Sequence, residues 1–312
     1  MSTIALCIPA YNASWCLPRL LESAKKQSIP FDEILVYNDC STDDTAAVAE
    51  KYGAKVINGT TNQGCSFGKN TLAEIAVSEW IHFHDADDEL LPNFTTLAHK
   101  WINKENTPDV VIFDYEYRDN DTHELLSKSS FDSLELEKDP IKYTILHQIN
   151  PFCGLYRSDK LRKIGGYDID EKILYNEDVA FHCKLAMAGL SFSAEKEVSI
   201  INYRIKNSMS NANQIKCAQA HFEVMSINAK KVGNMYGKEI AQKLWSNAVV
   251  LGVLSDWHTA KKAVDLAVKL DPSTPRKENL MIKLLSFFNP YFAIKFREKM
   301  IRLLKPKLRP NG

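Results

Sequence analysis

Both of the common glycine-rich phosphate-binding motifs are missing from the sequence. No GxGxxG follows the first predicted strand, and no GxxxxGK[ST] occurs anywhere in the 312 residues. A dinucleotide site and a P-loop are therefore disfavoured. A nucleotide-binding protein without such a loop needs another way to neutralise the diphosphate, and a divalent metal ion held by acidic side chains is one.

Cysteine pairs at metal-binding or redox spacing are missing as well. The seven cysteines are scattered, and none forms a CxxC pair. An odd number of scattered cysteines predicts neither a disulfide framework nor a thiolate zinc site. Reduced thiols in the cytosol fit this pattern better.

Net charge and long hydrophobic runs are also lacking. The 39 Lys and Arg residues balance 39 Asp and Glu residues, so no global field attracts nucleic acid. The sequence has no apolar run of about 18 residues and no signal peptide at its start, so we expect a cytoplasmic protein that spans no membrane. The hydrophobic fraction of 45% predicts a sizeable core.

Strands and helices alternate over the first part of the chain. Short apolar runs at residues 3–8, 31–37, 55–58 and 80–83 predict strands, with a helical pattern after each. Four alternations with short connections predict a mostly parallel α/β sheet flanked by helices. Residues 119–138 are polar and irregular, and they predict a mobile loop near the site.

Polar residues follow three of these strands. Tyr11 and Asn12 follow the first, Asp39 follows the second, and the acidic run Asp85–Glu89 follows the fourth. Ligands bind beyond the carboxyl ends of parallel strands, so we expect a site there. The acidic run suits Mg²⁺ or Mn²⁺ bridging to phosphate oxygens. The alternative is a solvated acidic turn before a helix that begins near residue 92.

Four short motifs follow one another between residues 8 and 88. They are Ile8-Pro9-Ala10-Tyr11-Asn12, Asn38-Asp39-Cys40-Ser41-Thr42-Asp43, Asn62-Gln63-Gly64 with Lys69-Asn70, and Asp85-Ala86-Asp87-Asp88. In their order and spacing the chain resembles family 2 glycosyltransferases over about residues 3 to 210. The resemblance implies a GT-A fold, an inverting reaction and a nucleoside diphosphate sugar donor, with a UDP-sugar favoured.

The resemblance also implies roles at the donor. Tyr11 would pack on the base, and Asp39 would accept a hydrogen bond from a uracil-type ring. Asp85 would face the nucleoside, and Asp87 would bind Mn²⁺ or Mg²⁺ on the diphosphate. The further residues implied at the donor are Pro9, Asn12, Asn62, Gly64, Lys69 and Ala86. The residues alone leave core packing open for Tyr11 and a turn cap open for Asp39.

Two later motifs resemble the acceptor side of the family. Gly165-Gly166-Tyr167-Asp168 would line the acceptor, and its glycines would end a short helix and allow close backbone approach. Glu177 and Asp178 open the next predicted helix. In the resembling family this pair carries the catalytic base, so Asp178 would take the proton of the acceptor hydroxyl and Glu177 would orient the acceptor. The alternative role of the pair is helix capping.

One position departs from the family pattern. Residues 201–210 resemble its closing segment, in which a histidine that often completes the metal site stands where this chain has Lys206. A protonated lysine cannot bind a metal ion, but it can neutralise a diphosphate. We therefore expect an ion held mainly by Asp87 and the diphosphate, with Lys206 or Arg204 binding the diphosphate directly.

Helical patterns replace strands after residue 210, which predicts a catalytic domain over residues 1–210 and a helical region over residues 211–312. Residues 276–312 contain ten Lys or Arg against Glu278 and Glu298, together with many large hydrophobic residues. A basic helix with an aromatic face fits an anionic membrane surface. The alternative is a helix packed on the catalytic domain with a solvated basic face. Binding to a membrane would bring the enzyme to a lipid-linked acceptor in bacterial surface-polysaccharide or lipopolysaccharide synthesis.

Two other functions remain open from the sequence. His82, His84 and Asp85 could form part of a metallohydrolase site, because alternate residues of a strand share a face, although no distant histidine is evident as a further ligand. A non-catalytic module that binds a sugar nucleotide would carry the same donor motifs. It would bind UDP without hydrolysing any UDP-sugar.

Overall fold

The computed structural model describes residues 2–205, 212–273 and 280–309, and it divides into two compact units. The first unit comprises Met1–Thr144, Gln148–Ile169 and Glu177–Ser208. The second comprises Ile145–His147, Asp170–Asn176 and Met209–Gly312. The domain boundary predicted at residue 210 lies outside the described residues.

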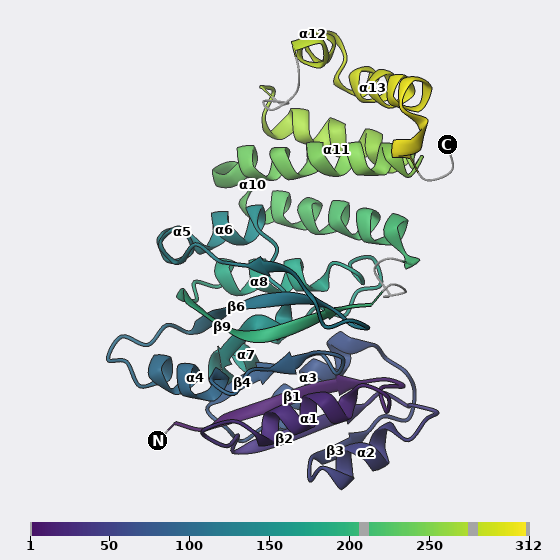
Figure 1. Ribbon diagram of the computed structural model, residues 1–312. Coiled ribbons are helices and arrows are strands. Elements are labelled where there is room, and N and C mark those ends of the chain that lie inside the picture. The colour runs from purple at the N-terminus through teal and green to yellow at the C-terminus, as the bar shows by residue number, and fades with distance from the viewer. Residues whose placement is uncertain (1, 206–211, 274–279, 310–312) are drawn as a thin grey trace. The chain divides into compact units, whose positions relative to one another are not determined.

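A single sheet organises the first unit (Figure 1). Within the described residues its nine strands follow the order β3-β2-β1-β4-β8-β6-β9-β5, and β7 pairs with β6 outside this path. The strands are β1 (Ile4–Ala10), β2 (Glu33–Asn38), β3 (Lys55–Asn58), β4 (Trp80–Phe83), β5 (Glu89–Leu90), β6 (Val110–Asp119), β7 (Leu125–Ser129), β8 (Gly154–Arg157) and β9 (Phe192–Arg204).

The four strands that the sequence predicted pair in parallel. β1 lies between β2 and β4, and β3 pairs with β2. The residues of β1 and β4 are almost all buried, as expected for central strands covered on both faces. Beyond β4 the sheet is mixed: β8 is antiparallel to β4 and β6, while β9 is parallel to β6.

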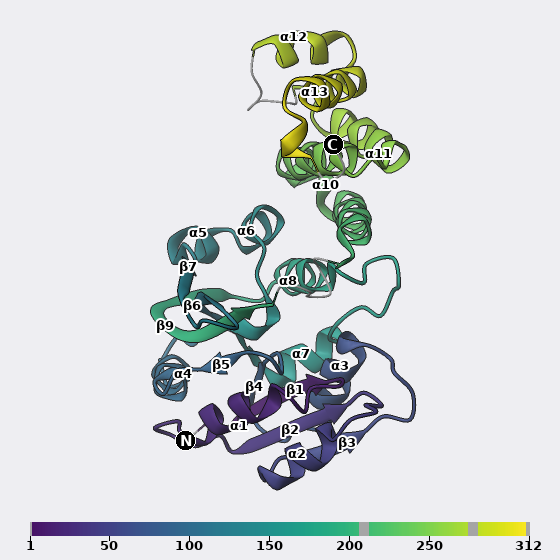
Figure 2. The ribbon, with the colours of Figure 1, turned by 45° about the vertical axis from the view of Figure 1, so that its right-hand side comes forward.

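Helices cover both faces of the parallel part of the sheet. The helices that precede α10 (Gln214–Val253) are α1 (Leu17–Lys25), α2 (Thr45–Lys51), α3 (Cys65–Ile75), α4 (Phe94–Ile102), α5 (Ser133–Lys138), α6 (Pro140–Leu146), α7 (Ser158–Ile164) and α8 (Glu177–Met187), with a 3₁₀ turn at Pro151–Cys153. α1 and α2 lie on one face, and α3 and α7 lie on the other (Figure 2). This follows from right-handed crossovers, because the chain moves outward from β1 to β3 and then returns to β4.

The prediction of a mobile loop over residues 119–138 is wrong. Leu125–Ser129 forms the edge strand β7, which is antiparallel to β6, and Ser133–Lys138 forms α5. Asp132 caps α5 by accepting a hydrogen bond from the Glu135 N–H at 3.1 Å. The sequence did not reveal β7 because most of its side chains are exposed, so it lacks the apolar alternation of a half-buried strand.

The second unit is helical, as the sequence predicted for the C-terminal region. Its main helices within the described residues are α10 (Gln214–Val253), α11 (Trp257–Leu270), α12 (Leu280–Phe288) and α13 (Pro290–Leu304). α10 has a kink at Tyr236. Among the described residues, no helix combines the length and the apolar character needed to cross a membrane.

Candidate active site

The register of the parallel strands brings the predicted site residues to one edge of the sheet. Cys7 of β1 pairs with Leu35 of β2 and with Phe83 of β4. The carboxyl ends of these strands therefore lie side by side, and the segments that contain Tyr11, Asp39 and the acidic loop (residues 85–88) leave the sheet at the same edge.

Asp39 holds the loop before α3. One carboxylate oxygen accepts the Gln63 N–H at 2.8 Å, and the other accepts the Gly64 N–H at 2.8 Å. Gly64 adopts φ 85°, a left-handed conformation that favours glycine, directly before α3. Each oxygen keeps a second lone pair, so the cap described here leaves room for one more donor. The hydrogen bond to a uracil-type ring stays a prediction.

Tyr11 is 52% exposed, which excludes the alternative of core packing. Its neighbour Asn12 has a structural contact instead: its Oδ1 accepts the Thr42 N–H at 2.9 Å, and its own N–H donates to Ser41 Oγ at 3.0 Å. Asn12 thus ties the segment after β1 to the segment after β2. Three other residues were predicted at the donor. Pro9 lies within β1, Asn62 is exposed, and Ala86 in the acidic loop is partly buried.

The carboxylates of the acidic loop have different roles. Asp88 is fully buried and accepts hydrogen bonds from Asn202 Nδ2 at 2.8 Å and from the Tyr203 N–H at 2.9 Å, so it attaches the loop to β9. Asp85 forms an ion pair with Lys69 at 3.8 Å. Burial, followed by the negative charge of Asp85, raises the pKa of Asp87 to about 6. A cation bound at Asp87 would therefore offset the cost of ionising this carboxylate.

The donor set fits an ion that takes most of its ligands from a substrate. Among the described residues, no three His, Cys, Asp or Glu side chains come together as a metal site. Asp88 is committed to β9 and Asp85 to Lys69. Asp87 would hold Mg²⁺ or Mn²⁺, and diphosphate oxygens and water would supply the remaining ligands, as such ions commonly require.

Arg19 contributes a contact to this site that the sequence did not predict. It reaches from α1 and donates a hydrogen bond from Nη2 to the backbone oxygen of Asp87. Its Cζ lies 3.7 Å from the centre of the Tyr203 ring, and its charge lowers the pKa of Asp87. No local signal marks Arg19, because its partner lies 68 residues further along the chain.

Lys69 is the cation at the centre of the site. It lies within α3 and is only 1% exposed, and its Nζ lies 5.2 Å from the centre of the Tyr167 ring. Burial alone lowers its pKa, but the acidic groups around it raise the pKa more, so the net pKa lies above its usual value. These groups are Cys65, Asp85, Asp178 and Glu177. Lys69 therefore stays protonated and joins the acidic loop electrostatically to the predicted catalytic pair.

Asp178 has the properties expected of a functional carboxylate. It lies in the first turn of α8, and its buried Oδ1 accepts no hydrogen bond from any described residue. Burial raises its pKa to about 8; Lys69 lowers the pKa, and Glu177 and Asp85 raise it. Burial also raises the pKa of Glu177. A buried oxygen without a partner argues against simple helix capping, because a cap would use it.

His182 attaches the first turn of α8, which contains Asp178, to the sheet. His182 Nδ1 lies 2.8 Å from the backbone oxygen of Asp178, and His182 Nε2 lies 2.8 Å from the hydroxyl of Tyr156 on β8. Burial lowers the pKa of His182 to about 4, so the ring is neutral. It donates to the carbonyl and accepts from the tyrosine, which fixes the first turn of α8 against the sheet.

The predicted acceptor residues build the turn between α7 and α8. Gly165 ends α7 in the left-handed conformation, and Gly166 follows with φ 57°. Tyr167 is buried and stacks on Phe181 with ring centres 3.8 Å apart. Exposed Asp168 pairs with Lys184 at 2.7 Å. The glycines end the helix as predicted, but the group that closely approaches Gly166 is a side chain of the protein, Asn70. An acceptor-binding role for these residues stays a prediction.

Asn70 explains the close approach. A Cβ atom added at Gly166 would lie 2.2 Å from Asn70 Oδ1. The Asn70 side chain pairs with the backbone of Tyr167 on both sides: Oδ1 accepts the N–H at 2.8 Å, and Nδ2 donates to the carbonyl at 2.9 Å. Asn70 therefore binds α3 to the turn before the catalytic pair.

The predicted cations after β9 are only partly described. The Arg204 guanidinium stacks on Tyr117, with Cζ 3.8 Å from the ring centre, and the residue is exposed. Lys206 lies outside the described residues. A diphosphate contact by either residue stays a prediction.

His82 and His84 do not form a metal site. His82 Nδ1 lies 2.8 Å from the Gly154 carbonyl, and His82 Nε2 lies 2.9 Å from His84 Nδ1. Burial lowers the pKa of His82 to about 3 and that of His84 well below its usual value. Both rings are neutral and buried, and the metallohydrolase alternative has no ligand set among the described residues.

Comparisons with known proteins decide the family. The family model of glycosyl transferase family 2 matches residues 5–165. The chain belongs to glycosyl transferase family 2. Crystal structures of Staphylococcus aureus TarS in complex with UDP-GlcNAc and of the mannosyltransferase PcManGT from Pyrobaculum calidifontis in complex with GDP-Man and Mn²⁺ share its fold. The TarS structure has a TM-score of 0.60 at 18% identity over 87% of this chain and 91% of that one. PcManGT has a TM-score of 0.58 at 16% identity over 97% and 87%.

Curated relatives agree with this assignment. An uncharacterized glycosyltransferase of Rickettsia prowazekii is 28% identical over 182 residues, which is 57% of each protein. The poly(ribitol-phosphate) beta-N-acetylglucosaminyltransferase TarS of Staphylococcus aureus is 34% identical over 121 residues, 36% of this chain and 19% of TarS. The match with the Rickettsia relative thus covers little more than half of that protein. The predicted family and the predicted GT-A-type fold with a helical C-terminal region are confirmed.

Proposed function

We propose that this family 2 glycosyltransferase moves a sugar, with inversion, from a UDP-sugar to a hydroxyl of a glycan or lipid-linked acceptor. The observation that carries the proposal is the buried oxygen Oδ1 of the partly exposed Asp178, which has no hydrogen-bond partner among the described residues and is under the electrostatic influence of Lys69 and Asp85. Unpaired buried carboxylates with raised pKa values are common among general bases.

The residues support a single displacement step. Asp178 takes the proton of the acceptor hydroxyl while that oxygen attacks the anomeric carbon. The bond from this carbon to the diphosphate oxygen breaks, and UDP leaves from the opposite face, so the configuration inverts. Glu177, next to Asp178 in the first turn of α8, orients the acceptor.

Neutralising the leaving group is the second requirement. A divalent ion between Asp87 and the diphosphate would stabilise the negative charge that develops there. Arg19 holds the backbone at Asp87, and Asp88 attaches the same loop to β9, so the loop is fixed before a substrate binds. Metal dependence is part of the proposal, and the donor set described above supports it.

The uridine preference is supported by the segments after β1 and β2. Exposed Tyr11 offers an aromatic face for a base, and Asp39 keeps acceptor capacity for a ring N–H. Among the structures with the same fold, TarS carries UDP-GlcNAc and PcManGT carries GDP-Man with Mn²⁺. TarS is named for the transfer of N-acetylglucosamine to poly(ribitol-phosphate). The likeness to TarS supports a UDP-sugar donor and a role in bacterial surface-polysaccharide synthesis, whereas the likeness to PcManGT is the reason to test GDP-sugars as well.

A donor screen tests the proposal. The full chain is incubated with UDP- and GDP-sugars and Mn²⁺, Mg²⁺ or EDTA, and free nucleotide is measured. We expect slow, metal-dependent hydrolysis of one UDP-sugar. Asp178→Asn should lower turnover roughly 10²–10⁴-fold with UDP affinity unchanged. Asp87→Ala should remove the metal dependence of UDP binding, and Asp265→Asn serves as an exposed control.

Three outcomes would contradict the proposal. UDP binding without hydrolysis of any UDP-sugar would favour the non-catalytic module. Unchanged turnover in Asp178→Asn would exclude Asp178 as the base. Metal-dependent UDP binding that persists in Asp87→Ala would place the ion elsewhere.

A further inference from the structure

The last two helices expose large apolar side chains that the sequence could not assign to a buried or an exposed surface. Phe287 and Phe288 at the end of α12 are 87% and 85% exposed. Other large apolar residues of α12, α13 and the following turn are also exposed: Leu284, Phe292, Leu303, Leu304 and Leu308. Single exposed apolar residues are ordinary, but seven within 25 residues form an exposed apolar surface.

One side of α13 accounts for its packing within the second unit. Ala293 and Ile294 are buried, and Asn289 caps the helix by accepting the Phe292 N–H at 2.9 Å. The cap and these two buried residues stabilise α13 without using the exposed side chains of Phe292, Leu303 and Leu304. Among the described residues, nothing covers Phe287 and Phe288.

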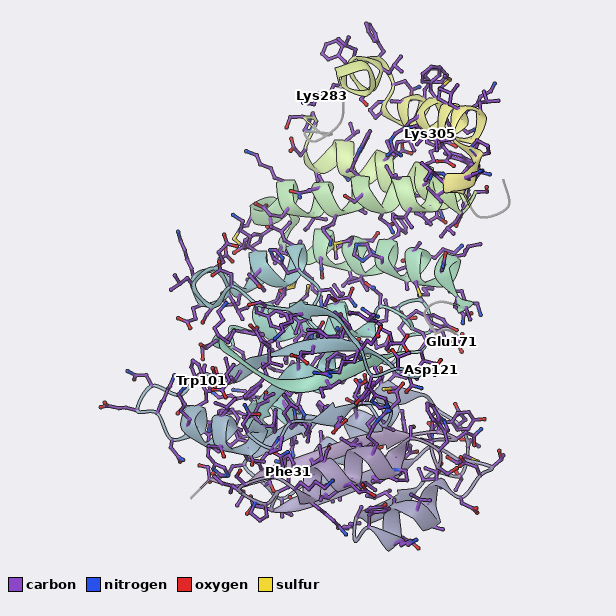
Figure 3. All side chains as sticks on the ribbon, viewed as in Figure 1. Phe31, Trp101, Asp121, Glu171, Lys283 and Lys305 are labelled. Atoms are coloured by element: carbon purple, nitrogen blue, oxygen red, sulfur yellow. The ribbon has the colours of Figure 1, made fainter. Side chains whose placement is uncertain are left out.

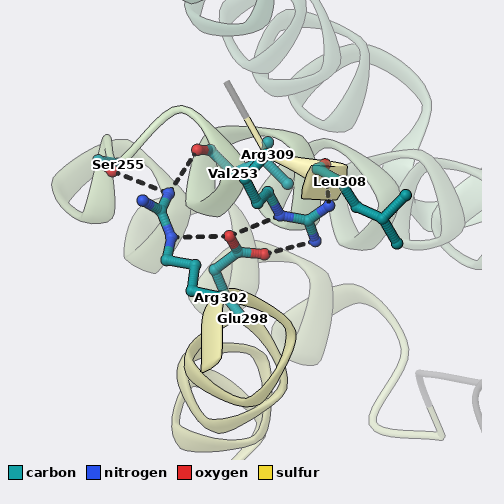
Figure 4. Close-up of polar contacts among 6 residues, drawn as sticks. All are labelled: Val253, Ser255, Glu298, Arg302, Leu308 and Arg309. Carbon is teal, nitrogen blue, oxygen red and sulfur yellow. Dashed lines mark hydrogen bonds and ion pairs between the residues drawn. The ribbon is translucent and has the colours of Figure 1, made fainter. Parts of the chain in front are cut away.

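The charge of this surface depends on one carboxylate. Glu298 is the single acidic residue between Lys283 and Arg309. Its side chain is buried, and it accepts hydrogen bonds from Arg302 Nε at 2.9 Å and from Arg309 Nε and Nη2 at 2.7 Å each (Figure 4). Over residues 283–309, the described surface therefore presents no carboxylate.

Five lysines are exposed among these apolar residues: Lys283, Lys295, Lys299, Lys305 and Lys307. Arg297 is partly buried. Lys283 and Lys305 are labelled in Figure 3, on α12 and just after α13. The surface thus combines exposed phenylalanine and leucine side chains with lysines and lacks any competing negative charge.

We propose that α12, α13 and the following turn form a docking face for a bilayer that contains anionic phospholipid. Phe287, Phe288 and their apolar neighbours would enter the boundary between headgroups and acyl chains, and the lysines would bind the headgroup phosphates. Membrane binding of this kind needs both an apolar and a basic contribution, and both are present here. The inference does not depend on the proposed transfer reaction.

The charge pattern favours a lipid surface over two other occupants. A second copy of the chain would bring lysines against lysines in a symmetric dimer, which is repulsive. A nucleic acid would satisfy the lysines but would leave the leucine and phenylalanine side chains without an apolar partner. An anionic bilayer satisfies both kinds of group at once.

Vesicle sedimentation with the full chain tests the inference. Vesicles of phosphatidylglycerol with phosphatidylcholine are compared with vesicles of phosphatidylcholine alone, at low and high ionic strength. We expect binding to the anionic vesicles that weakens at high salt. The double variant Phe287→Ser with Phe288→Ser should bind at least tenfold more weakly. The control Val77→Ser with Leu134→Ser, two exposed apolar residues of the first unit, should bind like the original chain.

A charge series separates the two contributions. Lys299→Glu with Lys305→Glu and Lys307→Glu should lower binding to anionic vesicles at least tenfold and remove the salt dependence. Lys26→Glu with Lys51→Glu and Lys55→Glu makes the same change in net charge at exposed positions of the first unit and should have little effect. All positions are exposed, so melting temperatures and hydrolysis of UDP-sugars without vesicles should stay unchanged.

Several results would overturn the inference. Equal binding of the original chain and the α12–α13 variants would place the contact elsewhere, and equal binding to neutral and anionic vesicles would exclude headgroup recognition. A change of sedimentation coefficient in Phe287→Ser with Phe288→Ser, without a change in vesicle binding, would identify a second copy as the occupant. Binding of duplex DNA that matches vesicle binding and survives loss of the phenylalanines would identify a general polyanion site.

Discussion

At the scale of single residues, the central interaction of the site is the effect of the Lys69 charge on the pKa of Asp178. Burial raises the pKa of Asp178 to about 8, and the positive charge of Lys69 opposes this shift. A base with a pKa near the working pH can both take a proton and release it, so this balance suits general-base catalysis. Glu177 and Asp85 repel the ionised form of Asp178, so the carboxylate loses its proton less readily than an exposed aspartate.

The titration of Asp178 predicts a pH dependence. The base must be deprotonated, so kcat/KM for the transfer should rise with pH and level off above about 8. Lys69→Met removes the charge that lowers the pKa of Asp178, so the rise should move to higher pH. The measurement is kcat/KM for the acceptor as a function of pH, with the donor and the metal ion at saturating concentrations. Lys163→Met, an exposed lysine of α7, should leave the profile unchanged, and an unmoved profile in Lys69→Met would contradict the electrostatic link.

At the scale of elements, the glycine turn after α7 (Gly165 and Gly166) precedes the helix that carries the predicted catalytic pair. Gly165 and Gly166 both have φ values in the left-handed region, but their surroundings differ. A Cβ at Gly165 would meet nothing within 4 Å, whereas a Cβ at Gly166 would meet Asn70. Asn70 in turn pairs with the backbone of Tyr167, so the turn and α3 depend on each other.

The two glycines form a matched pair of positions for a stability test. Gly165→Ala should cost about 1–2 kcal/mol, the strain of a left-handed alanine. Gly166→Ala should cost roughly 1–3 kcal/mol more, because the new methyl group also displaces Asn70. Urea unfolding measures both. Similar losses in the two variants would show that Asn70 moves aside freely and does not lock the turn.

At the scale of the whole molecule, the chain carries a catalytic α/β unit and a helical unit with its own buried ion pair. The Arg309 and Arg302 guanidiniums lower the pKa of Glu298 more than burial raises it, so the carboxylate stays ionised. Arg302 also donates from Nη2 to the Val253 carbonyl at 2.8 Å (Figure 4). The cluster therefore attaches α13 to the end of α10 and sets the charge of the surface around it.

Loss of this carboxylate should loosen α13 and leave the catalytic unit unaffected. Glu298→Gln leaves two guanidiniums with a neutral partner and should cost about 1.5–3 kcal/mol, the range for a hydrogen bond to a charged group. Hydrogen exchange should quicken in α13 and not in β1 or β4, and UDP affinity should not change. Asp265→Asn breaks the exposed pair with Lys261 and should cost less than about 0.5 kcal/mol. Faster exchange in β1 would contradict a local role.

The sequence by itself determined the α/β order, the four parallel strands, the polar residues at their carboxyl ends and the helical C-terminal region. Apolar periodicity records which face of each element is buried, and that information is local. Tertiary structure alone decided which carboxylate is committed and which is available: Asp88 attaches to β9, Arg19 holds Asp87 from 68 residues away, and Asn70 binds Tyr167 from 97 residues away. It also decided that Phe287 and Phe288 are exposed while Glu298 is buried. Hydrogen-bond partners and solvent exposure depend on segments distant in the chain, so no local pattern in the sequence encodes them.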